Sequence, residues 1–143
     1  NLERIGRTAK RPVFVASRAF SPIGRVLVAY DGSRLAMKAV DQISRSPLFS
    51  GLGVTVVTVG ADTSTARKGL DDAKALLRAA GIAAETRLMA GRPDEVLSGL
   101  IGGEDFGLLV MGAFGHSRIR SFVIGSTTTE MVRSCQVPVL MVH

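Results

Sequence analysis

The chain has 143 residues, a mass of 15.1 kDa, a formal net charge of +6 at pH 7 and a sequence pI of about 10.4. Its 46% apolar and 21% charged residues are typical of one globular domain with enough core to fold unaided, and they exclude an intrinsically disordered chain. The single cysteine, Cys135, excludes an intramolecular disulfide, and no Cys/His cluster has the spacing of metal ligands.

The positive charge does not by itself indicate a nucleic-acid partner. Lys and Arg are scattered along the chain, and six Phe with one Tyr provide few surfaces on which bases could stack. Nucleotide phosphate is the simpler anionic partner. No apolar run approaches the roughly 18–20 residues of a membrane span, and no signal-peptide pattern opens the sequence. We therefore expect a cytoplasmic protein without a membrane partner.

The first residues of the chain resemble its last residues. Residues 7–17 align without gaps with residues 133–143, and Arg, Pro and Val coincide. Each segment predicts the end of a helix, a proline and a short strand. We expect residues 1–24 to be the remnant strand and linker of a preceding repeat, with the linker at Ser17–Gly24, and residues 25–143 to form the domain. The alternative is a coincidental match.

The domain opens with an apolar, β-branched run, Arg25–Tyr30, which predicts a strand. Asp31-Gly32-Ser33 follows directly, and apolar residues at helical spacing predict a helix over Arg34–Arg45. Either Asp31 or Ser33 can cap that helix.

The rest of the chain continues to alternate between strands and helices, punctuated by glycine and proline. The predicted elements are a strand Val54–Val59, a helix from Thr63 or Ser64 to Gly81, an edge strand Ala84–Met89, a helix from Pro93 to Gly102-Gly103, a strand Gly107–Met111, a helix from Ser126 to Cys135 and a last strand Val137–Val142.

Five strands alternating with four helices predict an α/β fold, a doubly wound, Rossmann-like parallel sheet with helices on both faces. We expect the order 3-2-1-4-5. Ligands bind such sheets beyond the carboxyl ends of the strands, where the strand order reverses. That point lies between strands 1 and 4, so the turn Asp31–Ser33 and the loop that begins at Gly112 should meet in one crevice.

This loop has the spacing Gly112-x2-Gly115-x9-Gly125-Ser126. Glycines allow a backbone to approach a ligand closely, and the N-terminus of the helix that follows favours phosphate. The pattern is neither a Walker A loop nor a compact Gly-x-Gly-x-x-Gly fingerprint. A phosphate cradle is one interpretation, and a plain βα loop with a serine helix cap is the other.

With these motifs in place, residues 25–143 resemble the universal stress protein family. The matching stretches are residues 28–33 after the first strand, residues 111–117, Gly125-Ser126 nine residues after Gly115, and residues 138–140 in the last strand. The glycine spacing resembles that of the ATP-binding branch of the family. The N-terminal segment is similar to the closing strand of a first domain in the tandem proteins of this family.

The resemblance implies an ATP site. Mg²⁺ could accompany the bound ATP, but no residues of the chain are assigned as metal ligands. Asp31 would meet the ribose or adenine end, the backbone of Val59 would bind adenine, and Arg118 or Arg120 would neutralise phosphate. The implied nucleotide-binding residues are Asp31, Ser33, Val59, Met111, Gly112, Gly115, His116, Ser117, Arg118, Gly125, Ser126 and Thr127. One departure concerns the helix cap, because Thr127 and Thr129 stand where the family often has an apolar residue and a Glu.

Several roles for these residues stay open. Asp31 could contact the ligand or could serve merely as a helix cap. His116 has no partnered nucleophile in the sequence, so no residue is assigned a catalytic role. We expect a mainly non-enzymatic stress-response or signalling module that binds an adenine nucleotide. A slow ATPase on the same site and a nucleotide-free dimerisation module are the alternatives. The apolar last strand needs covering, and we expect either Arg11–Ala16, in a pseudo-dimer with the preceding repeat, or the second subunit of a homodimer to cover it.

Overall fold

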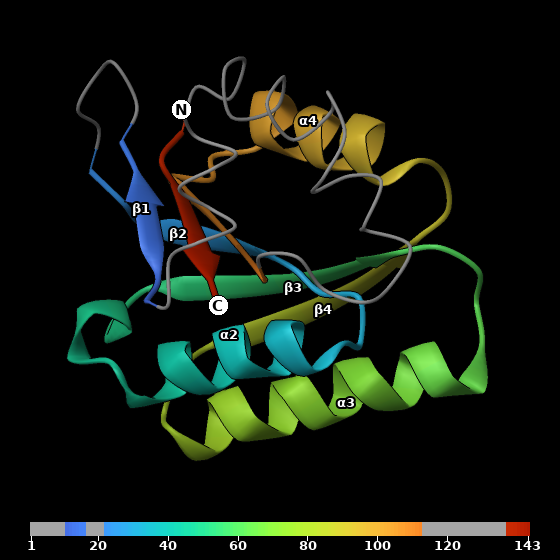
Figure 1. Ribbon diagram of the computed structural model, residues 1–143, viewed down its shortest axis with the longest axis horizontal. Coiled ribbons are helices and arrows are strands. Elements are labelled where there is room, and N and C mark those ends of the chain that lie inside the picture. Colours follow the sequence, from blue (N-terminus) through green and yellow to red (C-terminus); the bar gives the residue numbers. More distant parts are fainter. Residues whose placement is uncertain (1–10, 17–21, 113–136) are drawn as a thin grey trace.

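The computed structural model describes residues 11–16, 22–112 and 137–143, which form one six-stranded sheet with helices on both faces (Figure 1). The strands are β1 (Val13–Val15), β2 (Arg25–Ala29), β3 (Gly53–Val59), β4 (Ala84–Met89), β5 (Leu108–Gly112) and β6 (Val139–Val142). The helices are α2 (Arg34–Arg45), α3 (Ser64–Ala79) and α4 (Pro93–Gly103), with a short 3₁₀ turn at Pro47–Phe49.

The strands are ordered β1-β6-β5-β2-β3-β4. β2 to β6 pair in parallel, so the predicted order of the five domain strands is confirmed, with β4 at one edge. The predicted count of five strands is wrong by one. β1 adds a sixth strand, antiparallel to β6, with Phe14 opposite Leu140. Of the two expected covers for the last strand, this pairing confirms the segment Arg11–Ala16, and a preceding repeat stays a prediction.

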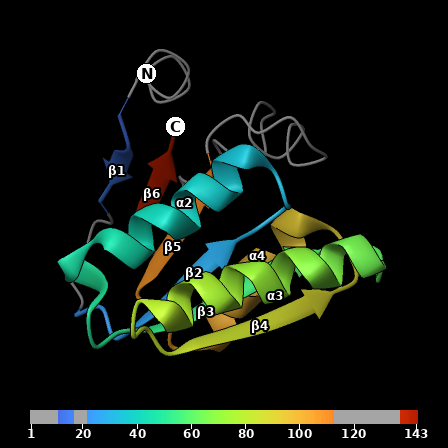
Figure 2. The ribbon, with the colours of Figure 1, turned by 90° about the horizontal axis from the view of Figure 1, so that it is seen from below.

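The sheet separates two hydrophobic layers. α2 and α3 cover one face, and α4 covers the other (Figures 1 and 2). Val26, Val28 and Val110 face the α2 and α3 side, whereas Leu27 and Leu109 face the α4 side, and all five side chains are buried. Burial on both faces explains why these strands are continuous apolar runs, as parallel sheets require.

Local capping fixes where the helices begin. Ser33 caps α2, Thr63 caps α3 by accepting a hydrogen bond from the Ala66 N–H at 3.0 Å, and Pro93 stands in the first turn of α4. The predicted helix of residues 126–135 lies outside the described residues, as do most of the predicted linker and residues 1–10. Within the described part of the chain, no helix is long and apolar enough to cross a membrane.

Candidate functional site at the carboxyl ends of β2 and β5

The strand order reverses direction between β2 and β5. β3 and β4 follow β2 on one side, and β6 and β1 follow β5 on the other. The two strands are direct neighbours, with Ala29 opposite Met111 at their carboxyl ends. The segments that follow, from Tyr30 and from Gly112, therefore start side by side at the place where doubly wound sheets bind ligands.

The turn after β2 is built by its own side chains. The Asp31 Oδ1 atom accepts a hydrogen bond from the Ser33 N–H at 2.9 Å, and the Ser33 Oγ atom accepts one from the Ala36 N–H at 3.1 Å. Gly32 between them has φ of +80°, a left-handed conformation that favours glycine. Asp31 thus closes the turn and Ser33 caps α2, so of the two predicted capping residues Ser33 is the helix cap.

The same turn is held on β3. The Tyr30 N–H donates to the Val57 carbonyl at 2.9 Å, and the Thr58 hydroxyl donates to the Tyr30 carbonyl at 2.8 Å. Burial raises the pKa of the Tyr30 phenol, and the charges of Asp72 and Asp31 act in the same direction. The phenol is therefore neutral at physiological pH and serves as part of the core beneath the turn.

Gly112 brings the start of the glycine loop against α2. A Cβ atom at Gly112 would lie 2.9 Å from the Leu35 carbonyl carbon and 3.0 Å from the Ala36 nitrogen, closer than real Cβ atoms approach backbone. The absence of a side chain lets the end of β5 contact the first turn of α2, which follows Asp31-Gly32-Ser33. The start of the glycine loop therefore lies against the helix that this turn opens, and the predicted meeting of the two loops stays a prediction, because residues 113–136 lie outside the described part of the chain.

The other predicted residues divide into three groups. Val59 ends β3, where the next amide, of Gly60, donates to the Met89 carbonyl at 2.8 Å. The Met111 side chain is only 3% exposed and belongs to the core on the α4 side, which leaves only its backbone for a ligand. The remaining predicted residues lie outside the described part of the chain: Gly115, His116, Ser117, Arg118, Gly125, Ser126 and Thr127.

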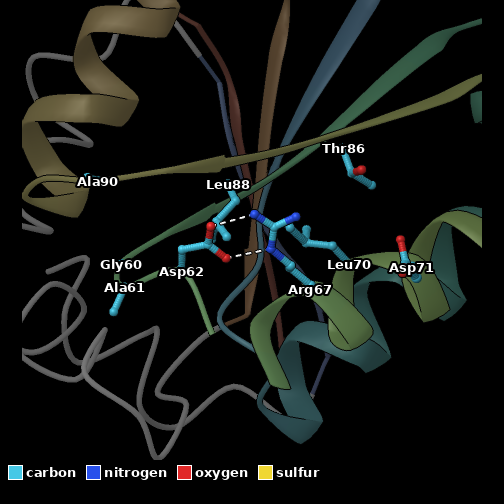
Figure 3. A pocket seen from close by; sticks show the side chains of 9 residues that line it. All are labelled: Gly60, Ala61, Asp62, Arg67, Leu70, Asp71, Thr86, Leu88 and Ala90. Atoms are coloured by element: carbon cyan, nitrogen blue, oxygen red, sulfur yellow. Dashed lines mark hydrogen bonds and ion pairs between the residues drawn. The ribbon is translucent and has the colours of Figure 1, made fainter. Parts of the chain in front are cut away.

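The structure also contains a cavity that the sequence analysis did not predict. Its volume is about 470 Å³, and it lies between the loop after β3, the first turns of α3 and strand β4. Leu70 and Leu88 form apolar walls, and the Arg67 guanidinium donates two hydrogen bonds to the Asp62 carboxylate beside them (Figure 3). Arg67 holds the pKa of Asp62 below its ordinary value. Gly60, which lines the cavity, directly follows Val59 in the chain.

This volume lies within the range of small-molecule sites, roughly 300–1,000 Å³. The sequence gives little indication of this cavity. Asp62 precedes α3, and it is five residues from Arg67, whereas side chains that pair on a helix are three or four residues apart. Among the described residues, no group of three or more His, Cys, Asp or Glu side chains could hold a metal ion.

Residues 60–143 match the model of the Universal stress protein family. Over 142 residues the chain is 39% identical to the "Universal stress protein Slr1230" of Synechocystis sp. (strain ATCC 27184 / PCC 6803 / Kazusa), a match that covers 98% of this chain. The chain belongs to the universal stress protein family. It spans 50% of the length of this curated relative.

Solved structures of family members share the architecture. A universal stress protein from Archaeoglobus fulgidus DSM 4304 superimposes with a TM-score of 0.78 at 25% identity, covering 98% of this chain and 52% of that one. A universal stress protein solved in complex with cAMP superimposes with a TM-score of 0.69 at 29% identity, covering 86% of this chain and 98% of that one. The latter shows that a family member of this fold binds an adenine nucleotide.

Proposed function

We propose that this chain is a nucleotide-binding module of the universal stress protein family that holds an adenine nucleotide, ATP in the first instance, beyond the carboxyl ends of β2, β3 and β5. The observation that carries the proposal is the contact between Gly112 and the first turn of α2. Gly112 begins the Gly-x2-Gly-x9-Gly-Ser segment, and the α2 turn that it contacts directly follows Asp31–Ser33, which supports a shared site.

The chemistry of the two segments suits the parts of a nucleotide. The Asp31 carboxylate is an acceptor for ribose hydroxyls or the adenine amino group, and its Oδ1 atom is already oriented by the Ser33 N–H. The glycines and Ser126 provide backbone and hydroxyl donors for phosphate. The related structure in complex with cAMP supports the same ligand class, because cAMP and ATP share adenine, ribose and phosphate.

Titration calorimetry with ATP and with cAMP tests the proposal. We expect micromolar binding of ATP by the wild-type chain and its loss in Gly115→Val, in which a side chain would block backbone approach. Asp31→Asn keeps the oxygen that accepts the Ser33 N–H but removes the charge, so the turn should persist while affinity falls about tenfold or more. Gly99→Ala, on the exposed side of α4, is the control and should bind as the wild type does.

Absence of binding by the wild-type chain to either nucleotide would overturn the proposal and leave the fold intact. Phosphate release separates a binding module from an ATPase. We expect no turnover above the rate without protein. Release that is lost in Asp31→Asn would instead assign the slow ATPase activity to this site.

A further inference from the structure

The side chain of Thr58 links two strands at the edge of the proposed site. Thr58 is the last residue but one of β3, and its hydroxyl donates to the Tyr30 carbonyl at 2.8 Å. This carbonyl belongs to the peptide group that joins Tyr30 to Asp31, the residue whose carboxylate closes the turn after β2. Because a peptide group is planar, a bond to its carbonyl fixes the orientation of the whole group. Thr58 therefore fixes the backbone from which Asp31 enters the turn.

The backbone N–H groups of β3 alternate between its two neighbouring strands. Those of Val54 and Gly60, at even positions, donate on the β4 side at 2.9 and 2.8 Å. That of Gly53, at an odd position, donates on the β2 side at 3.2 Å. Because bonds in a parallel ladder are evenly spaced, the N–H of Val59 is directed toward β2. The acceptor that continues the ladder there is the Tyr30 carbonyl.

The Val59 N–H does not make this ladder bond. The Tyr30 N–H donates to the Val57 carbonyl at 2.9 Å, as the ladder requires, but the Tyr30 carbonyl accepts the Thr58 hydroxyl and not the Val59 N–H. The N–H at the carboxyl end of β3 is thus without its ladder partner. Backbone donors need a partner, and this one lies at the edge where doubly wound sheets bind ligands.

We propose that Thr58 is a positioning residue of the nucleotide site, a role that rests on the proposed function. Its hydroxyl occupies the Tyr30 carbonyl, which holds the turn that carries Asp31 and keeps the Val59 N–H open for the base. Asp31 and Val59 are the groups expected at the nucleoside end of the ligand. Thr58 thus acts on the recognition of the nucleoside and not of the phosphates.

The hydroxyl and the Val59 N–H compete for one carbonyl. Carbonyl groups in folded chains are almost always paired, so removal of the hydroxyl should favour the ladder bond from Val59. That bond would extend the pairing of β2 with β3 and withdraw a donor from the site. Thr58→Val removes the hydroxyl, changes the shape of the side chain little and retains a residue suited to a strand.

Hydrogen exchange in the nucleotide-free protein, followed by NMR, tests this competition. The Val59 amide should exchange about tenfold or more slowly in Thr58→Val than in the wild type, because it gains an acceptor. Thr58→Ser retains the hydroxyl and should exchange as the wild type does. Thr55→Val is the matched control, since it makes the same change within β3 at a side chain that is 3% exposed. Equal exchange of Val59 in the wild type and Thr58→Val would overturn the proposal.

Calorimetry with ATP and with inorganic triphosphate tests the role in binding. Thr58→Val should bind ATP about tenfold or more weakly than the wild type and triphosphate equally well, whereas Thr58→Ser and Thr55→Val should bind both as the wild type does. An equal loss for both probes would indicate a general distortion and overturn the positioning role. If the wild type bound no ATP, the proposed function and the role toward a nucleotide would fall together. A slower exchange of Val59 in Thr58→Val would in that case still establish the competition for the Tyr30 carbonyl.

Discussion

Gly112 packs closely against α2 and also begins the glycine-rich segment of the proposed site. The end of β5 can contact α2 only because Gly112 has no Cβ, which would lie 2.9–3.0 Å from backbone atoms of Leu35 and Ala36. Gly112→Ala should therefore force β5 and α2 apart. We expect a loss of about 1–3 kcal/mol in the free energy of unfolding, the usual cost of overpacking. Urea denaturation followed by circular dichroism measures it.

Gly99 provides the control for this substitution. It lies in α4, and a Cβ atom there would have no neighbour within 4 Å. Gly99→Ala should raise the free energy of unfolding by about 0.5–1 kcal/mol, because alanine is the better helix former. If Gly112→Ala were as stable as the wild type, the contact with α2 would not be as close as the structure has it.

The roles of single residues could be predicted only in part. The sequence marks Gly112 as a position for close approach, but that its neighbour is α2 depends on the packing of elements about 75 residues apart. Asp31 and Ser33 were equally good candidates for the cap, because both carry a side-chain oxygen at the start of a helix. The hydrogen bonds distinguish them, because Ser33 accepts from the Ala36 N–H of the helix whereas Asp31 accepts from the Ser33 N–H within the turn.

At the scale of elements, one ion cluster joins three of them. Glu104, just after α4, accepts hydrogen bonds from Arg87 of β4 at 2.6 and 3.0 Å, and the Arg25 guanidinium of β2 lies 3.4 Å from it. Arg25 also stacks over the Phe106 ring at 4.3 Å from its centre. The hydrogen bond from Arg87, with a smaller contribution from Arg25, lowers the pKa of Glu104. The cluster therefore ties the end of α4 to the sheet.

This shift predicts a pH dependence. Because the pKa of Glu104 is lower in the folded than in the unfolded chain, its stabilising contribution is complete above the unfolded value of about 4.3 and is lost as the pH falls through the folded value. Glu104→Gln should be less stable than the wild type at pH 7 and should lose less stability on acidification. Urea midpoints at pH 7 and in the acid range measure both effects.

Glu95→Gln is the control, since the carboxylate of Glu95 is 69% exposed and 3.8 Å from Arg92. It should follow the wild-type pH dependence. A steeper acid loss in Glu104→Gln than in the wild type would contradict the assigned role of the cluster.

Most elements were predictable, and the reason is their burial. β2, β3 and β5 are covered on both faces, so they are rich in apolar and β-branched residues and stand out from the helices. The pairing of β1 with β6 was predictable from the repeat. The predicted sheet nevertheless had five strands, because β1 was assigned to a preceding repeat and not to this sheet. The link between Arg25 and Glu104 could not be predicted, because 79 residues separate them and no periodicity connects them.

For the whole molecule, the proposed site draws on several parts of the fold at once. The turn after β2 caps the N-terminus of α2 through Ser33 and is hydrogen-bonded to β3 through Tyr30. The segment after β5 starts at Gly112, which contacts the first turn of α2. A ligand held by these segments would bind only the folded chain, because the unfolded chain does not bring them together. Nucleotide binding should therefore stabilise the entire sheet rather than one loop.

The expected size of this effect follows from the linkage between binding and folding. At a nucleotide concentration about 100-fold above the dissociation constant, the gain is about 2.7 kcal/mol, which corresponds to a rise of about 5–10 °C in melting temperature for a chain of this length. Thermal unfolding at increasing ATP concentration measures it. Asp31→Asn should shift the curve to higher ATP concentration without changing the melting temperature of the free protein, since its turn is retained. Inorganic phosphate at equal concentration is the control. An equal rise with phosphate would mean that the site recognises phosphate alone and that Asp31 has no part in holding the nucleoside.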